Sequence, residues 1–106
     1  MRNLKWSDSE KKIARRIFEA ALQIELGEIM STFKEQAMRA TEPDEMWAVE
    51  DWLSQQRRAI DAKYDFRYSQ LIIVFGTLLR ENRITEEQLA CLGDDKLSFI
   101  KHIAES

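Results

Sequence analysis

Turn-forming residues are almost absent from the first part of the chain. From Ser7 to Arg39 there is no proline and one glycine, Gly27, and the whole chain of 106 residues has only three glycines and one proline. A sheet protein needs many turns and therefore many such residues. Apolar residues recur at three- and four-residue intervals through this part, as on one face of an α-helix. The sequence therefore predicts an all-α fold made of a few long helices.

The first helix has a clear predicted start. Ser7 and Glu10 form a capping box, in which each side chain accepts a hydrogen bond from the other residue's backbone N–H. Helical periodicity continues to about Arg39, where we expect the helix to end. Gly27 inside this helix costs about 1 kcal/mol relative to alanine. A close helix–helix contact at Gly27 would offset that cost.

A short connection follows, from Ala40 to Asp44. Thr41 is predicted to cap the next helix, and Pro43 suits its first turn, where no backbone N–H is needed. Helices joined by so short a link pack side by side in opposite directions. The prediction is a long antiparallel hairpin, called the stalk below, over about residues 7–64.

The second helix carries an apolar stripe with an eleven-residue period. The stripe comprises Val49, Leu53, Ile60, Tyr64, Leu71 and Phe75. This period keeps one face apolar along the whole stretch. A single helix from Asp44 to Glu81 would be about 57 Å long, whereas a compact chain of this size has a radius of gyration of about 13 Å. Because the chain cannot cover such a stripe by itself, we expect a dimer.

Two alternatives remain within this stretch. Leu71–Phe75 alone has the composition of a strand, although its helical neighbours favour a buried helix. The alternative to one continuous helix is a break near Tyr64–Tyr68, which would separate the stalk from a compact helical head over about residues 65–106. Stalk and head are predicted to form one domain, residues 1–106.

The predicted head has its own helix start and stop signals. Thr85 and Gln88 form a second capping box, and Gly93 suits the end of a short helix. Asp94 is then predicted to cap a last helix at about Asp95–Ala104. Its inward-facing residues are predicted to be Leu97, Ile100 and Ile103.

Residues with catalytic or metal-binding chemistry are few and scattered. The single cysteine, Cys91, and the single histidine, His102, are separated by the helix-ending Gly93, which argues against a nucleophile–base pair. Paired Glu-x-x-His motifs, a phosphate loop, a calcium loop and a zinc pattern are all missing from the sequence. We expect neither an enzyme nor a bound metal or cofactor.

Charge and cysteine content suggest a compartment and exclude some partners. With 16 Lys and Arg against 19 Asp and Glu, the chain lacks the basic field that nucleic-acid binding requires. Residues 1–20 hold six basic and three acidic side chains, which we interpret as a solvated helix start. One cysteine and no signal peptide in Met1–Glu10 fit the cytoplasm. Leu71–Leu79 is too short an apolar run for membrane insertion.

Arg57 interrupts the apolar stripe between Leu53 and Ile60. A guanidinium in that position needs an ionic partner. One reading pairs it with Asp61 on the same helix. The other pairs it with an acidic residue of a second copy, such as Asp51, a contact that a two-fold dimer makes twice. Both readings remain open on the sequence.

Trp47 shares its helix face mainly with charged and polar residues: Asp51, Ser54, Arg58, Asp61 and Asp65. The chain's own core does not explain a tryptophan there, whereas aromatic and arginine anchors mark protein interfaces. Trp52 lies on a different side of the same helix, and the alternative reading is that the first helix covers one of the two tryptophans.

These same residues resemble a known family, the fluorescence recovery proteins of cyanobacteria. The matching run is Asp44-x-x-Trp47-x-x-x-Asp51-x-Leu53-Ser54-x-x-Arg57-x-x-Ile60-Asp61-x-Lys63-Tyr64-Asp65-x-Arg67-x-Ser69. Shorter matches are Trp6-Ser7, Glu25-Leu26, Val74-Phe75, Leu78-Leu79 and Asp95-Lys96. Glu50, Ile73 and Phe99 depart from the family pattern, which can have a histidine, an aromatic and a basic residue there.

The resemblance implies a dimeric, cofactor-free, all-α protein with a long stalk and a compact head. It implies binding to the photoactivated orange carotenoid protein through that partner's C-terminal domain, faster red-to-orange conversion and detachment from the phycobilisome, which ends photoprotective quenching. It also implies a place near the cytoplasmic face of thylakoid membranes.

The candidate residues fall into two sets. The predicted dimer interface is Trp47, Asp51, Leu53, Arg57 and Ile60. The predicted partner-binding residues are Trp47, Trp52, Asp51, Arg57, Ile73, Phe75, Leu79 and Phe99. Two other functions are weighed: a helical-dimer adaptor with another protein client, and a helix-turn-helix DNA binder over residues 84–104. The second needs a positive recognition helix, yet Lys96 and Lys101 are the only basic residues among several acidic ones there.

Overall fold

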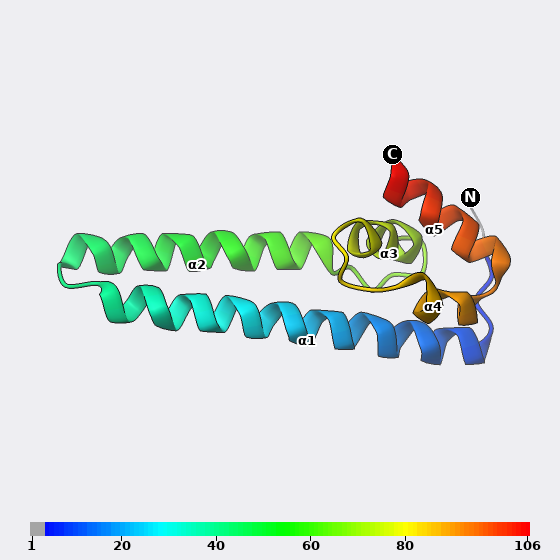
Figure 1. The fold of residues 1–106 in the computed structure, drawn as a ribbon, viewed down its shortest axis with the longest axis horizontal. Helices are drawn as coiled ribbons and strands as arrows, with labels where there is room; N and C mark the ends of the chain where they lie inside the picture. Colours follow the sequence, from blue (N-terminus) through cyan, green and yellow to red (C-terminus); the bar gives the residue numbers. More distant parts are fainter. Residues whose placement is uncertain (1–3) are drawn as a thin grey trace.

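A computed structural model describes residues 4–106, and it is elongated. Its dimensions are 53 × 24 × 21 Å and its radius of gyration is 16.8 Å, against about 13 Å for a compact chain of this length. Figure 1 shows two long antiparallel helices that form a stalk, with a cluster of shorter helices at one end. No strand occurs within residues 4–106, and the all-α prediction is confirmed.

Helix α1 spans Asp8–Arg39 and begins at the predicted capping box. The Glu10 backbone N–H donates to Ser7 Oγ at 3.2 Å, and the Ser7 N–H donates to Glu10 Oε1 at 2.7 Å. An alanine side chain at Gly27 would meet no heavy atom within 4 Å. The expectation of a close contact at Gly27 is therefore wrong within the chain, because this side of α1 faces solvent.

Helix α2 spans Pro43–Lys63 and runs antiparallel to α1, as predicted (Figure 1). Its N-cap residue is Glu42, which forms no side-chain capping bond. The expected cap, Thr41, instead donates its hydroxyl to Glu45 Oε1 at 3.1 Å. The prediction of Thr41 as the cap was wrong, since the chain stays extended for one more residue.

The second helix breaks where the sequence allowed it to break. Helix α2 ends at Lys63, residues 64–70 form a connector, and helix α3 spans Leu71–Arg80. The single helix from Asp44 to Glu81 is therefore wrong, and α2 is only about 32 Å long. Leu71–Phe75 is helical rather than extended. Because the long helix is broken, its length no longer supports a dimer. The expectation of a dimer rests instead on α2, which has no buried residue within the chain.

The rest of the head consists of α4 (Glu86–Leu89), the 3-10 turn η1 (Ala90–Leu92) and α5 (Asp94–Glu105). The Thr85–Gln88 capping box is present, and Gly93 has φ 100°, the positive value that favours glycine. Helix α5 begins one residue earlier than predicted, with Gly93 rather than Asp94 as its N-cap.

Helices α3 and α5 pack closely because α3 has a glycine at their contact. A Cβ atom built on Gly76 would lie 2.5 Å from Ile103 Cβ. Only a residue without a side chain fits there. Almost the whole circumference of α3 is buried: Leu71, Ile72, Val74, Phe75, Gly76 and Leu78.

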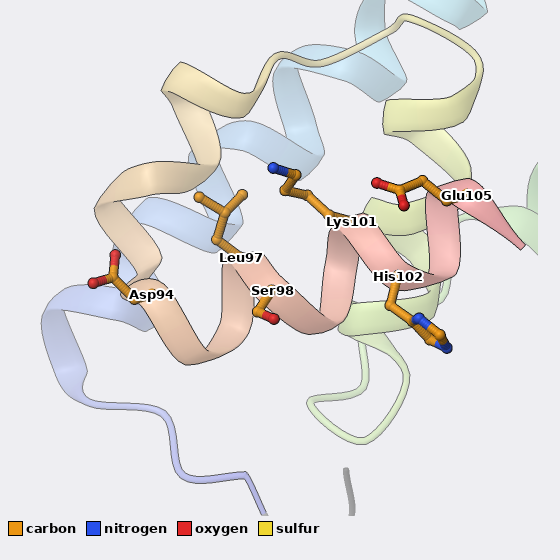
Figure 2. Close-up of a pocket in the computed structure, with 6 residues that line it drawn as sticks. All are labelled: Asp94, Leu97, Ser98, Lys101, His102 and Glu105. Carbon is orange, nitrogen blue, oxygen red and sulfur yellow. The ribbon is translucent and has the colours of Figure 1, made fainter.

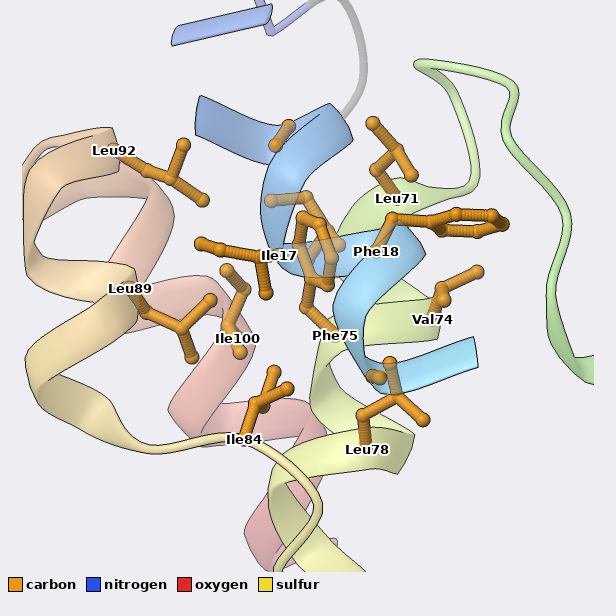
Figure 3. Close-up of a cluster of buried hydrophobic side chains, with 13 residues drawn as sticks. Ile17, Phe18, Leu71, Val74, Phe75, Leu78, Ile84, Leu89, Leu92 and Ile100 are labelled. Atoms are coloured by element: carbon orange, nitrogen blue, oxygen red, sulfur yellow. The ribbon is translucent and has the colours of Figure 1, made fainter. Parts of the chain in front are cut away.

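The hydrophobic core lies in the head and includes the first half of α1. Ala14, Ile17, Phe18 and Ala21 are buried together with residues of α3, α4, η1 and α5. Figure 3 shows Ile17 beside Phe75 near the centre of this core. Helix α1 is therefore one element shared by head and stalk.

Candidate functional site: the exposed stalk face and its junction with the head

Helix α2 has no buried residue, although it carries several large apolar side chains. Trp47 is 58% exposed and Met46 50%, and Met30 on the neighbouring α1 is 55% exposed. Near the tip of the stalk, the two helices form an apolar groove. It is lined by Phe33, Ala37, Ala40, Met46, Trp47, Val49, Glu50 and Leu53. The stalk thus presents apolar surface that its own chain leaves uncovered.

The predicted dimer residues lie along this helix. Trp47, Asp51 and Arg57 are exposed, whereas Leu53 and Ile60 are half-buried. Within residues 4–106, neither Arg57 nor Asp51 has an ion-pair partner. The Arg57–Asp61 pair, one of the two readings of the sequence, is not formed.

Trp52 lies on the side of α2 that faces α1. It is half-buried and lines a small depression with Ile29 and Thr32 of α1 and with Arg83 of the head. The alternative reading, in which the first helix covers one of the two tryptophans, therefore applies to Trp52. Trp47 remains exposed.

The predicted contact residues of the head differ in accessibility. Ile73 is 42% exposed, and Leu79 and Phe99 are half-buried against the core. Phe75 is 0% exposed. Its assignment as a partner contact needs correction, because the side chain points into the centre of the core in Figure 3.

An ion network that sequence reasoning missed joins stalk and head. Glu25 of α1 accepts hydrogen bonds from Lys63 Nζ and from the Tyr64 hydroxyl, each at 2.8 Å. Lys63 also donates to Glu81 at 2.8 Å. Arg83 completes the network, 3.2 Å from both Glu25 and Glu81. The end of α2, the middle of α1 and the turn after α3 therefore meet at one point.

Burial and charge act against each other at Glu25, whose side chain is 13% exposed. Burial raises the pKa of its carboxyl, but the hydrogen bonds from Lys63 and Tyr64 and the charges of Lys63 and Arg83 outweigh it. The net result is a Glu25 pKa below its ordinary value. Burial and the bond to Glu25 raise the pKa of Tyr64. The Glu25 carboxylate is therefore ionised at neutral pH and accepts the hydrogen bond that the Tyr64 hydroxyl donates.

The connector is held against α1 by a row of aromatic rings. Tyr64, Phe66 and Tyr68 alternate with polar residues along the connector. Ring centroids lie 5.4 Å apart between Tyr64 and Phe18, and 4.9 Å apart between Phe18 and Phe66. Tyr68 continues the row to Phe66 at 5.6 Å and to Trp6 at 5.8 Å. Such contacts fix the connector where the helix breaks.

The outer surface of α5 has an open polar depression. Its lining residues are Asp94, Leu97, Ser98, Lys101, His102 and Glu105. Figure 2 shows His102 pointing away from Leu97 and Lys101. Across residues 4–106, no three His, Cys, Asp or Glu side chains gather where they would hold a metal ion. The helices within residues 4–106 include no candidate for a membrane span, since none combines the required length with the required hydropathy.

Fold and site together define a class of protein: an elongated helical protein with a compact head and an uncovered apolar stalk face. A family model described as "Photoprotection regulator fluorescence recovery protein" matches residues 6–104. The chain therefore belongs to the fluorescence recovery protein family, which is a family of regulators by its description.

Individual relatives agree with this assignment. The fluorescence recovery protein of Synechocystis sp. (strain PCC 6803) is 41% identical over 99 residues, which cover 93% of this chain and 91% of that protein. The solved structure of the Fremyella diplosiphon protein is 31% identical with a TM-score of 0.90, covering 96% of this chain and 100% of that one. The Synechocystis structure gives the same TM-score and coverage at 40% identity.

Proposed function

We propose that this protein binds the photoactivated orange carotenoid protein and accelerates its return from the red to the orange form. It thereby promotes detachment from the phycobilisome and ends photoprotective quenching. Family membership over residues 6–104 carries this proposal. The uncovered apolar stalk face supports it, because such a surface suits a protein partner.

The mechanism is preferential binding without covalent chemistry. A protein that binds the transition state of the red-to-orange change more tightly than the red form lowers the barrier between the two forms. Each tenfold acceleration corresponds to about 1.4 kcal/mol of such preferential binding. No cofactor or metal enters this mechanism. It operates in the cytoplasm, near the thylakoid surface that carries the phycobilisomes.

The protein acts as a homodimer formed through the stalk. Leu53 and Ile60 supply apolar contact on α2, and Trp47 is a large exposed anchor beside them. Arg57 and Asp51 lack an ion-pair partner among residues 4–106, so each is free to pair with the opposite charge on a second copy. A two-fold axis makes every such contact twice.

The carotenoid protein's C-terminal domain contacts both parts of the molecule. On the stalk, the binding residues are Trp47, Trp52, Asp51 and Arg57. On the head they are Ile73, Leu79 and Phe99. Ile73 is the most accessible of the head residues, at 42% exposure. Phe75 supports the head from inside and is excluded from the contact surface.

Dark relaxation of photoactivated carotenoid protein tests this function. Absorbance is followed with and without substoichiometric amounts of this chain. A marked acceleration is the expected result, since one regulator serves many partner molecules in turn. Unchanged relaxation with a folded dimer would reject the proposal and favour the adaptor reading, in which the stalk face serves another protein client.

A further inference from the structure

A second surface lies on the head, where two cations rest on aromatic rings. The guanidinium carbon of Arg15 is 3.7 Å from the centroid of the Phe66 ring, and Lys11 Nζ is 5.2 Å from that of Tyr68. We call these four residues the cationic–aromatic patch. It joins α1 to the connector, and none of its members belongs to the contact residues proposed above.

The two rings of the patch pack against other aromatic side chains of the head. Phe66 packs edge-on against Phe18, which is 5% exposed and part of the core. Tyr68 contacts both Phe66 and Trp6. The rings therefore have fixed positions, and the cations stacked on them lose little conformational freedom when a ligand binds.

Arg15 keeps most of its donors free. Its only ion pair within residues 4–106 is a single contact to Glu19 at 3.6 Å, and both side chains are more than half exposed. Stacking covers one face of the guanidinium and leaves its N–H edge accessible. A planar edge with parallel donors is the geometry that binds a carboxylate through two hydrogen bonds.

The charge around the patch is opposite to that of the whole chain. Residues 4–20 contain five Lys and Arg against three Asp and Glu, whereas the complete sequence has a net charge of −3. One of the three acids, Glu10, is already paired with the buried Lys96 at 3.0 Å. A basic region on an acidic protein attracts and orients a negatively charged partner surface.

We propose that the cationic–aromatic patch docks a carboxylate-rich segment of the protein partner, with Arg15 taking a carboxylate through two hydrogen bonds and Lys11 adding a second charge contact. This inference rests on the proposed function and adds the chemistry of the partner's surface to it. A nucleic acid fits less well, because its backbone needs an extended basic field, whereas this chain has a net charge of −3 and its excess of basic residues is confined to a short region.

The test measures the affinity for photoactivated carotenoid protein as a function of salt concentration. The double variant Lys11→Gln/Arg15→Gln is compared with the control Lys12→Gln/Arg16→Gln. The control removes the same charge from the two neighbouring positions of α1, which are exposed and stack on no ring within residues 4–106. The patch variant is expected to bind about tenfold more weakly at low salt and to lose most of its salt dependence. The control is expected to change the dissociation constant by no more than about threefold.

Equal weakening in both variants would overturn the proposal in favour of a general electrostatic field. A shift in the self-association constant of the patch variant alone would assign the patch to a second copy. Salt-dependent retention of a labelled DNA duplex, lost in the patch variant, would assign it to nucleic acid. Each of these three results would overturn the proposal.

A labelled hexaglutamate peptide separates this inference from the proposed function. Chemical-shift changes confined to the patch in the wild type, and absent in Lys11→Gln/Arg15→Gln, are expected in amide NMR spectra. If the wild type binds the peptide but not the carotenoid protein, the proposed function fails and the carboxylate site stands. If it binds the carotenoid protein but not the peptide, and the patch variant is unimpaired, only the inference fails.

Discussion

Lys63, the last residue of α2, places its ammonium group 2.8 Å from the carboxylate of Glu25 in the middle of α1. The two side chains are 17% and 13% exposed, so their attraction is screened less than that of a surface pair. They fix the end of the stalk helix against the head at the point where the chain turns into the connector.

Replacing Lys63 with methionine is expected to destabilise the fold. The substitution keeps an unbranched side chain but removes one of the two cations that Glu25 and Glu81 share, leaving Arg83 as the other, at a cost of about 1–3 kcal/mol. Urea denaturation measures the loss. Lys34→Met, on an exposed position of α1, is the control and should change stability by less than about 0.5 kcal/mol. Equal effects of the two substitutions would contradict the structural role of the network.

Acid should destabilise the protein through the same carboxylate. The Glu25 pKa is lowered in the folded state, so this residue contributes stability that is complete above its ordinary value of 4.5 and is lost as the pH falls through the lower, folded value. Glu25→Gln should therefore reduce the dependence of the unfolding free energy on pH below 4.5.

Some acid dependence will remain in that variant. The backbone hydrogen bond from Ser7 and the contact with Lys96 also lower the pKa of Glu10. Glu35→Gln, an exposed position farther along α1, serves as the control in urea titrations at several pH values. A wild-type slope preserved in Glu25→Gln would show that Glu25 does not carry this effect.

Two glycines in helices should respond oppositely to alanine. Gly76→Ala forces a methyl group against Ile103 in the α3–α5 contact and should cost about 1–3 kcal/mol through overpacking. Gly27→Ala adds a methyl group in open space and should stabilise α1 by up to about 1 kcal/mol. Thermal unfolding of both variants provides the measurement. A tolerated Gly76→Ala would mean that the two head helices separate easily.

Trp47→Ala should weaken self-association or partner binding while leaving the fold intact. The side chain is 58% exposed, so its removal costs the monomer little buried surface. Sedimentation equilibrium and affinity for the carotenoid protein report the two effects, and circular dichroism reports the helices. Met38→Ala, at a position 87% exposed near the tip, is the matched control. Unchanged association and affinity would remove Trp47 from the interface.

The proposed Arg57–Asp51 contact between copies can be tested by exchanging charges. Arg57→Asp and Asp51→Arg should each weaken the dimer, since each places like charges together across the two-fold axis. The double variant restores opposite charges and should regain much of the affinity. Sedimentation equilibrium measures all three. If the double variant loses as much free energy of dimerisation as the two single variants together, the two residues do not pair.

Local signals in the sequence predicted local structure well. Both capping boxes formed, because a serine or threonine and its partner three residues later interact within one helical turn. The break near Tyr64 was identified as an alternative. The apolar periodicity of this stretch does not reveal why the helix breaks. The rings of Tyr64 and Phe66 in the connector pack on Phe18, which is far away in the sequence.

Long-range relationships were not predictable in this way. Glu25, Lys63 and Arg83 lie far apart in the sequence, and each alone has the appearance of a solvated charge. The family resemblance contained Glu25 and Lys63 without indicating that they meet. Phe75 was misplaced for a related reason: α3 is apolar almost all round, so periodicity cannot tell which side faces the core.

Helix α1 passes without interruption from the core of the head to the tip of the stalk. Its 32 residues make a rod about 48 Å long, clamped at one end by Ala14, Ile17, Phe18 and Ala21. A rod held in this way acts as a lever: when a partner tilts the free end, the clamped end must turn with it. The orientation of the stalk and the packing of the head are thus coupled through a single helix.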